Sequence, residues 1–223
     1  MKKNNFSPFD YEEIRSLRIK LIKEAFNESN RGFLLVGTAY VEEQLTKLID
    51  DFLPNQSKSY RKKLFEYPGQ LSSLSSKIEL AYCFRIIGEK LYNSLNILRK
   101  LRNDVAHSSD EFSLVDYEEK MNQIYNLGPN IGIMIHNQGI EHMMHAKLFK
   151  LSETFNHFEL SSQERKSYLD DLMSDEKIIS ILDKQLPQWK LIIGILFISG
   201  LLVFYREQNS KVIEKYKIWS CME

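Results

Sequence analysis

The stretch LIIGILFISGLLVFY, Leu191–Tyr205, decides how this chain folds, because it runs for fifteen residues without a charge. As an α-helix it would span about 22 Å, whereas the hydrocarbon core of a bilayer is roughly 30 Å thick. A helix that is apolar on every side lies either at the centre of a bundle or in lipid. Because the stretch is shorter than the bilayer core, we expect a buried core helix, with membrane insertion through residues 189–205 as the alternative. Basic residues flank both ends of the stretch, so the distribution of charge does not decide between the two.

The composition predicts an all-α protein. The chain has 223 residues, enough to bury a core, and its nine Gly and five Pro fall between long periodic runs. Thirty basic residues balance thirty acidic ones, so any nucleic-acid contact needs a local patch. Cys83 and Cys221 are too far apart to form a CxxC zinc pair, which suits a reducing compartment. The N-terminal residues lack the apolar stretch of a secretory signal, so we expect a cytoplasmic protein, with membrane association as the alternative.

Amphipathic periodicity divides the rest of the chain into helices. The clearest are expected over 9–29, 32–53, 71–87, 89–107 and 114–127, with a short helix within 55–70. Beyond residue 128 the pattern weakens: NIGIMI, residues 130–135, resembles a short strand or buried turn, and two further helices are expected over 139–158 and 163–185. We therefore predict a helical core over 1–127, a variable helical insert over 128–188, and an apolar C-terminal helix with its tail over 189–223.

The side chains best suited to catalysis lie at the end of the expected helix 89–107, in the segment RNDVAH from Arg102 to His107. RNA cleavage without a metal needs a base for the 2′-hydroxyl proton and an acid for the leaving 5′-oxygen, and histidine suits either role. The planar guanidinium of Arg102 suits the phosphate. Asn103 lies one turn before His107 and would fix its tautomer. Since each chain supplies one such histidine, cleavage predicts a two-fold homodimer with the motif at its seam.

Two glutamates of the expected helix 32–53 have alternative roles. Glu42 and Glu43 interrupt an otherwise apolar surface. They lie either on the solvent-exposed side of that helix or close to Arg102, in which case one of them would orient the Arg102 side chain. A purely structural role for the motif is also open, with His107 at the negative end of the helix dipole and Arg102 paired to a glutamate.

The helix that precedes the motif is the most cationic surface of the chain. Five basic residues stand against one acid, Glu89, between positions 85 and 102; they are Arg85, Lys90, Arg99, Lys100 and Arg102. We expect Arg99 to support the motif, and Arg85 and Lys100 to bind RNA. A second basic run, Lys58 to Lys63, is interpreted as a solvated surface, with a nucleic-acid groove as the alternative.

The sequence indicates no metal or cofactor. Four histidines cluster between residues 136 and 157, but no cysteine lies near them, and Met143-Met144 favour packing over a zinc site. The chain contains no glycine-rich phosphate loop, no GxSxG elbow and no HExxH motif.

Residues 33–53 and 69–108 resemble the mannitol operon repressor (MltR-like) family, a branch of the all-helical HEPN superfamily. Three segments carry the resemblance: G-x-A-Y-x-E-E at Gly37–Glu43, S-x-K-I-E-L-A-Y at Ser75–Tyr82, and R-K-L-R-N-x-x-A-H at Arg99–His107. The resemblance covers roughly residues 30–125 and does not extend to the insert or to the apolar helix. It implies an HEPN-like up-and-down helical bundle.

The resemblance implies two functions. HEPN proteins with an intact R-N-x-x-x-H motif, which Arg102, Asn103 and His107 match, are often metal-independent endoribonucleases of toxin–antitoxin, defence or RNA-processing systems. RNA binding and cleavage at a dimer cleft is therefore the leading expectation, with an antitoxin among the expected partners. The alternative is a non-catalytic transcriptional regulator of the MltR-like kind, which acts through protein partners.

Overall fold

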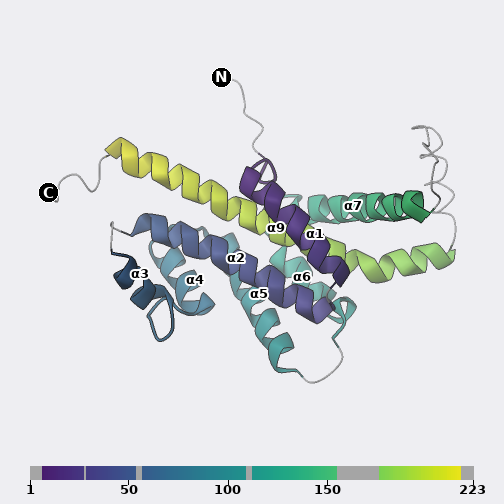
Figure 1. Cartoon of the computed structure of the whole chain (residues 1–223), viewed down its shortest axis with the longest axis horizontal. Coiled ribbons are helices and arrows are strands. Elements are labelled where there is room, and N and C mark those ends of the chain that lie inside the picture. Colours follow the sequence, from purple (N-terminus) through teal and green to yellow (C-terminus); the bar gives the residue numbers. More distant parts are fainter. Residues whose placement is uncertain (1–6, 28, 54–56, 109–111, 155–175, 217–223) are drawn as a thin grey trace.

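The computed structural model describes residues 7–27, 29–53, 57–108, 112–154 and 176–216 (Figure 1). Within these ranges it contains eight α-helices, one short 3-10 helix and no strand, which confirms the all-α prediction. The elements are α1 (Glu12–Asn27), α2 (Asn30–Phe52), α3 (Lys58–Phe65), α4 (Leu74–Cys83), α5 (Glu89–His107), the 3-10 helix η1 (Leu114–Tyr117), α6 (Glu118–Ile124), α7 (Ile131–Thr154) and α9 (Glu176–Tyr216).

Serine side chains begin several of these helices. The hydroxyls of Ser29, Ser57 and Ser73 accept hydrogen bonds from backbone amides in the first turns of α2, α3 and α4. Each bond satisfies one of the amide groups that a helix start leaves without an intrahelical partner. These local signals explain why the predicted starts of these helices agree with the structure to within a few residues.

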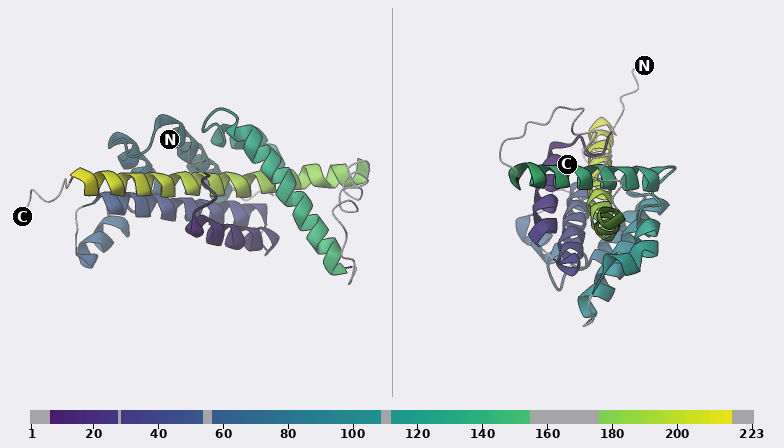
Figure 2. Two further views of the ribbon diagram at one scale, coloured as in Figure 1. Left: turned by 90° about the horizontal axis from the view of Figure 1, so that it is seen from above. Right: turned by 90° about the vertical axis from the view of Figure 1, so that its right-hand side faces the viewer.

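The long helix α9 is the axis of the molecule. It extends along the whole bundle, α2 runs beside it, and α7 crosses it obliquely (Figures 1 and 2). Every residue from Trp189 to Gly200 is buried. By length and composition, residues Asp183–Ser210 could cross a membrane, but 83% of the apolar window is covered by the other helices. The expected core helix is therefore confirmed, and the fold is of a soluble kind.

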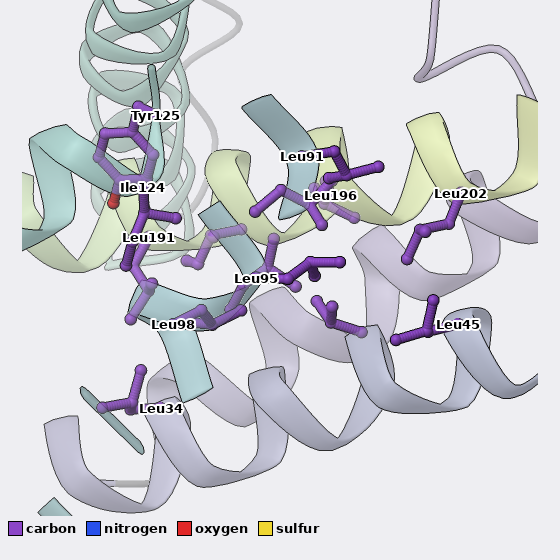
Figure 3. Close-up of a cluster of buried hydrophobic side chains, with 14 of the residues drawn as sticks. Leu34, Leu45, Leu91, Leu95, Leu98, Ile124, Tyr125, Leu191, Leu196 and Leu202 are labelled. Carbon is purple, nitrogen blue, oxygen red and sulfur yellow. The ribbon is translucent and has the colours of Figure 1, made fainter. Parts of the chain in front are cut away.

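Glycines set how closely α9 approaches its neighbours. A Cβ atom on Gly37 of α2 would overlap Ile195, one on Gly194 would overlap the Tyr125 ring, and one on Gly200 would overlap the backbone of Pro8. Leucines from α2, α5 and α9 fill the space between these close approaches (Figure 3). Because interiors are close-packed, Gly194 and Gly200 leave no room for a larger residue, whereas at Gly37 the end of the Ile195 side chain would have to shift.

Ion pairs hold both ends of the apolar segment. Before it, the Lys190 ammonium, which is almost fully buried, donates to Glu118 Oε1 at 2.9 Å and to Asn122 Oδ1 at 3.2 Å. After it, Arg206 donates to Glu13 Oε2 of α1 at 2.8 Å. Both cations that flank the uncharged stretch are thus paired with carboxylates of other helices. Beside a membrane, such cations would instead extend to the membrane–water interface.

Glu13 is the centre of the second of these clusters. Its Oε1 accepts hydrogen bonds from Lys47 Nζ at 2.6 Å and from Gln44 Nε2 at 3.0 Å, both on α2. Burial alone would raise the pKa of Glu13, but the hydrogen bonds from Lys47, Arg206 and Gln44 outweigh it and lower the pKa to about 2. The cluster therefore joins α1, α2 and α9 most strongly while Glu13 is ionised.

The insert differs from its prediction. The strand or turn expected at residues 130–135 is wrong, because helix α7 begins at Ile131 directly after Asn130, which adopts a φ of 62°. Ile135, Gly139 and Met143, spaced four apart, form the buried face of α7. Exposed Ile133 hides this period in the sequence. Residues 163–175 lie outside the described ranges, and α9 begins at Glu176, so it runs through the expected boundary at 188.

Gly200→Ala is expected to destabilise the fold by about 1–3 kcal/mol, because the added methyl group overlaps the Pro8 backbone, which has little freedom to move. This holds even though alanine is the better helix former. Gly132→Ala in α7 is the matched control: no atom lies within 4 Å of its added Cβ, so no loss is expected. Urea unfolding measures both, and equal midpoints for the Gly200 variant and the parent chain would contradict the close approach.

Glu13 also predicts how stability depends on pH. Its folded pKa of about 2 lies below the ordinary value of 4.5, so its contribution is complete above pH 4.5 and is lost as the pH falls towards 2. Since the carboxylate is partly exposed, we expect a loss of about 1–2 kcal/mol. Glu13→Gln should remove this part of the pH profile, whereas Glu12→Gln, whose side chain is 87% exposed, should keep it. Urea unfolding at pH 2–7 makes the comparison.

Candidate functional site

The predicted motif lies at the C-terminal end of α5, which projects away from α9 (Figure 1). This end is held by Arg31 of α2, whose Nη1 donates to the Ser108 carbonyl oxygen at 2.6 Å, and by Lys120 of α6, which pairs with Asp104 at 3.1 Å. The helix ends at His107, where the Ser108 amide closes the last turn on the Asp104 carbonyl oxygen at 3.1 Å. Arg102 and His107 are exposed, and Asn103 is half-buried. Arg102 Nη1 donates to Asn103 Oδ1 at 3.0 Å. The motif is therefore open to solvent and to a second molecule.

One polar stripe leads along α5 to this motif. Tyr92, Asn96, Arg99 and Asn103 follow each other at spacings of three and four, so they share a face of the helix. Asn96 Nδ2 donates to the Tyr92 carbonyl oxygen at 3.3 Å, and Asn96 Oδ1 accepts from Arg99 Nε and Nη2 at 3.4 Å. Arg99 is thus oriented by Asn96 and does not contact the motif through any hydrogen bond among the described residues.

The two glutamates of α2 do not meet Arg102. Glu42 Oε1 accepts from the Lys77 ammonium of α4 at 2.7 Å, and Glu43 pairs with Lys47 within α2 at 2.9 Å. The Lys77 side chain is only 7% exposed, so its charge depends on Glu42 for compensation. Lys77 lies three residues after Leu74 and four before Ala81, both buried, and this place on the apolar face of α4 was the sign in the sequence that the lysine is buried.

The five cations between residues 85 and 102 have no carboxylate partner within the described residues; they are Arg85 in the turn before α5, and Lys90, Arg99, Lys100 and Arg102 of α5. By contrast, in the basic run of α3 Arg61 pairs with Asp50 at 2.8 Å and Lys62 approaches Glu66 at 3.6 Å. The surface formed by α4, α5 and the turn between them, here called the α4–α5 side, therefore carries more uncompensated positive charge than the surface of α3.

Two open pockets lie away from the motif. One, of about 580 Å³, is lined by Tyr60, Lys63 and Tyr67 of α3 and the loop that follows it. The other, of about 560 Å³, lies between η1 and the start of α9, beside Val115, Glu118 and Leu186. Both are wide surface hollows, so neither has the enclosed shape of a pocket that buries a small substrate.

The histidines of α7 do not gather around a metal position. Within the described residues, no three side chains of the histidine, cysteine or carboxylate kind are placed to hold an ion; His157 lies outside them. Burial lowers the pKa of His142, and nearby Arg18 lowers it further, which keeps the imidazole neutral to lower pH.

The comparisons with known proteins place the fold. No family model matches the sequence, and no curated protein matches it. A solved structure does: the X-ray structure of the MtlR–HPr complex from Escherichia coli has a chain that superposes with a TM-score of 0.52 at 14% sequence identity. The match covers 84% of this chain and 98% of that one. The chain therefore has an MtlR-like fold. This confirms, for the fold, the resemblance to the mannitol operon repressor family that three short segments of the sequence carry.

Glu42→Gln is expected to cost about 2 kcal/mol of stability, because it leaves the Lys77 ammonium buried without a counter-charge. The loss is smaller than the roughly 3–5 kcal/mol of a fully buried pair because Glu42 is partly exposed. Adding Lys77→Met should restore most of it, because the double variant buries no charge. Glu43→Gln is the control, with an expected change below about 1 kcal/mol. If Glu42→Gln proved as mild as this control, the Glu42–Lys77 pair would not have the stated role.

Proposed function

We propose that this chain is a non-catalytic regulatory module of the MtlR-like kind, which acts by binding a protein partner. The observation that carries the proposal is the fold match to MtlR, a protein whose structure was determined in complex with HPr. Through such a partner the module would affect transcription. With α9 covered by the other helices, the module would work in the cytoplasm as a soluble protein.

The distribution of charge supports a binding role. The buried cations Lys77 and Lys190 are each paired with a carboxylate from another helix, so they hold elements together. Five further cations, between residues 85 and 102, make no ion pair among the described residues and lie on the surface of the α4–α5 side, together with exposed aromatic rings. Positive charge of this kind directs an anionic partner to one side of a protein and suppresses wrong encounters.

Binding to HPr from the same organism tests this function. We expect a saturable titration by calorimetry, with a dissociation constant in the range of about 1–100 μM that is typical of transient signalling contacts. The affinity should weaken as salt rises from 50 to 500 mM, since exposed charges contribute. A titration without heat, together with separate elution of the two proteins on a sizing column, would reject the proposed partner.

Metal-independent RNA cleavage is the second candidate, and one observation favours it. Arg102 and His107 are exposed at the C-terminal end of α5, so a second copy of the chain could bring two arginines and two histidines around one phosphate. In this reading one imidazole takes the 2′-hydroxyl proton, the other protonates the leaving oxygen, and the guanidinium groups stabilise the charge on the phosphate.

His107→Ala tests this second candidate. If the chain is a ribonuclease, the substitution should lower the cleavage of a labelled single-stranded RNA in EDTA by at least about a hundredfold, because it removes the acid–base group. The fold should persist, since His107 is exposed. His136→Ala, at another exposed histidine in α7, is the control and should cleave like the parent. Cleavage that is equal in all three proteins would point to a contaminant and reject the candidate.

A further inference from the structure

The turn between α4 and α5 displays its aromatic side chains. Phe84 is 71% exposed, the most of any apolar side chain in this part of the fold. Beside it the rings of Tyr82 and Tyr92 stack at 4.2 Å with an interplanar angle of 22°. The Tyr92 hydroxyl donates to Glu79 Oε1 at 3.0 Å, which fixes the stack to α4. Exposed aromatic groups held in this way are typical of binding surfaces.

The backbone of this turn is held in place although it is strained. Arg85 has a φ of 55°, a left-handed conformation that glycine adopts with less strain. The amides of Ile86 and Ile87 both donate to the Ala81 carbonyl oxygen, at 2.8 and 3.2 Å, and both side chains are buried. Phe84 and Arg85 therefore project from a rigid base, and an arginine occupies the position that glycine would suit. Strain of this kind often marks functional positions.

Charge and composition indicate what this turn can bind. The Arg85 side chain makes no hydrogen bond or ion pair within the described residues, and Lys90, the second residue of α5, makes no ion pair there either. Aromatic residues and arginine are the side chains that contribute most to protein–protein binding, and exclusion of water strengthens their contacts. Because Tyr82 and Tyr92 already cover one face of each other, they offer less surface for nucleobases than two separate rings would.

We propose that Phe84 and Arg85, supported by the Tyr82–Tyr92 stack, form the docking surface for the protein partner; this inference rests on the proposed function. The partner has an apolar pocket that receives the Phe84 ring, bordered by carboxylates that pair with the Arg85 guanidinium. Docking removes the most exposed ring of this side from water and gives the unpaired cation its counter-charge.

Two substitutions test the surface in the intact chain, with calorimetric titration of HPr from the same organism as the readout. Phe84→Ala and Arg85→Gly should each weaken binding at least tenfold. Arg85→Gly also relieves the left-handed strain, so its melting temperature should equal or exceed that of the parent. Loss of binding in this variant cannot then be attributed to unfolding. Ile19→Ala, at a 70% exposed isoleucine of α1, and Lys63→Ala in α3 are the matched controls and should bind like the parent.

The outcomes separate the surface from the function. If the parent chain binds HPr and both variants bind equally well, the docking surface is wrong while the proposed function stands. If the parent does not bind, the proposed function is rejected and this surface with it. A change in the mass of the free chain caused by Phe84→Ala, measured by light scattering, would assign the surface to a second copy and overturn the proposal. Retained HPr binding with loss of binding to a labelled single-stranded RNA would assign it to RNA and do the same.

Discussion

The need to remove the uncharged middle of α9 from water positions the helices that pack around it. Each buried leucine or isoleucine of that segment contributes roughly 1.5–3 kcal/mol, and no single neighbouring helix can cover all its sides. Helices α1, α2, α6 and α7 therefore surround it, and glycines at positions 37, 194 and 200 allow them close enough to exclude water. The bundle is organised around a helix that would otherwise require lipid.

Charge completes this arrangement at both ends of the segment. Lys190 and Arg206 border the uncharged stretch, and Glu118 and Glu13 neutralise them from other helices. A carboxylate within hydrogen-bonding distance compensates the loss of hydration that burial imposes on a cation. The same rule explains the pairing of Lys77 with Glu42. These buried charges join helices to one another, so the binding of a partner must use charges on the surface.

On the surface of α4 and α5, five cations lack such carboxylate partners among the described residues. Asn96 orients Arg99, and Asn103 accepts from Arg102, so the two arginines are directed by neutral side chains and keep their full charge. Tyr92, whose ring stacks on Tyr82 of α4, and His107 of the motif both lie on α5, and the 15 residues between them correspond to roughly 22 Å of helix. Both proposed functions therefore use the same side of the molecule.

The sequence by itself determined the helical class, the central place of the apolar stretch and the position of Arg102 and His107 at a helix end. Each of these follows from local periodicity, from length or from capping residues. Only the tertiary structure decided which charges meet. Glu42 and Lys77 are 35 residues apart, and Glu13 and Arg206 are 193 apart, so no local pattern specifies the pairing. The left-handed turn at Arg85 and the helical start of α7 were decided in the same way, because buried neighbours distant in sequence outweigh the preference of a short segment.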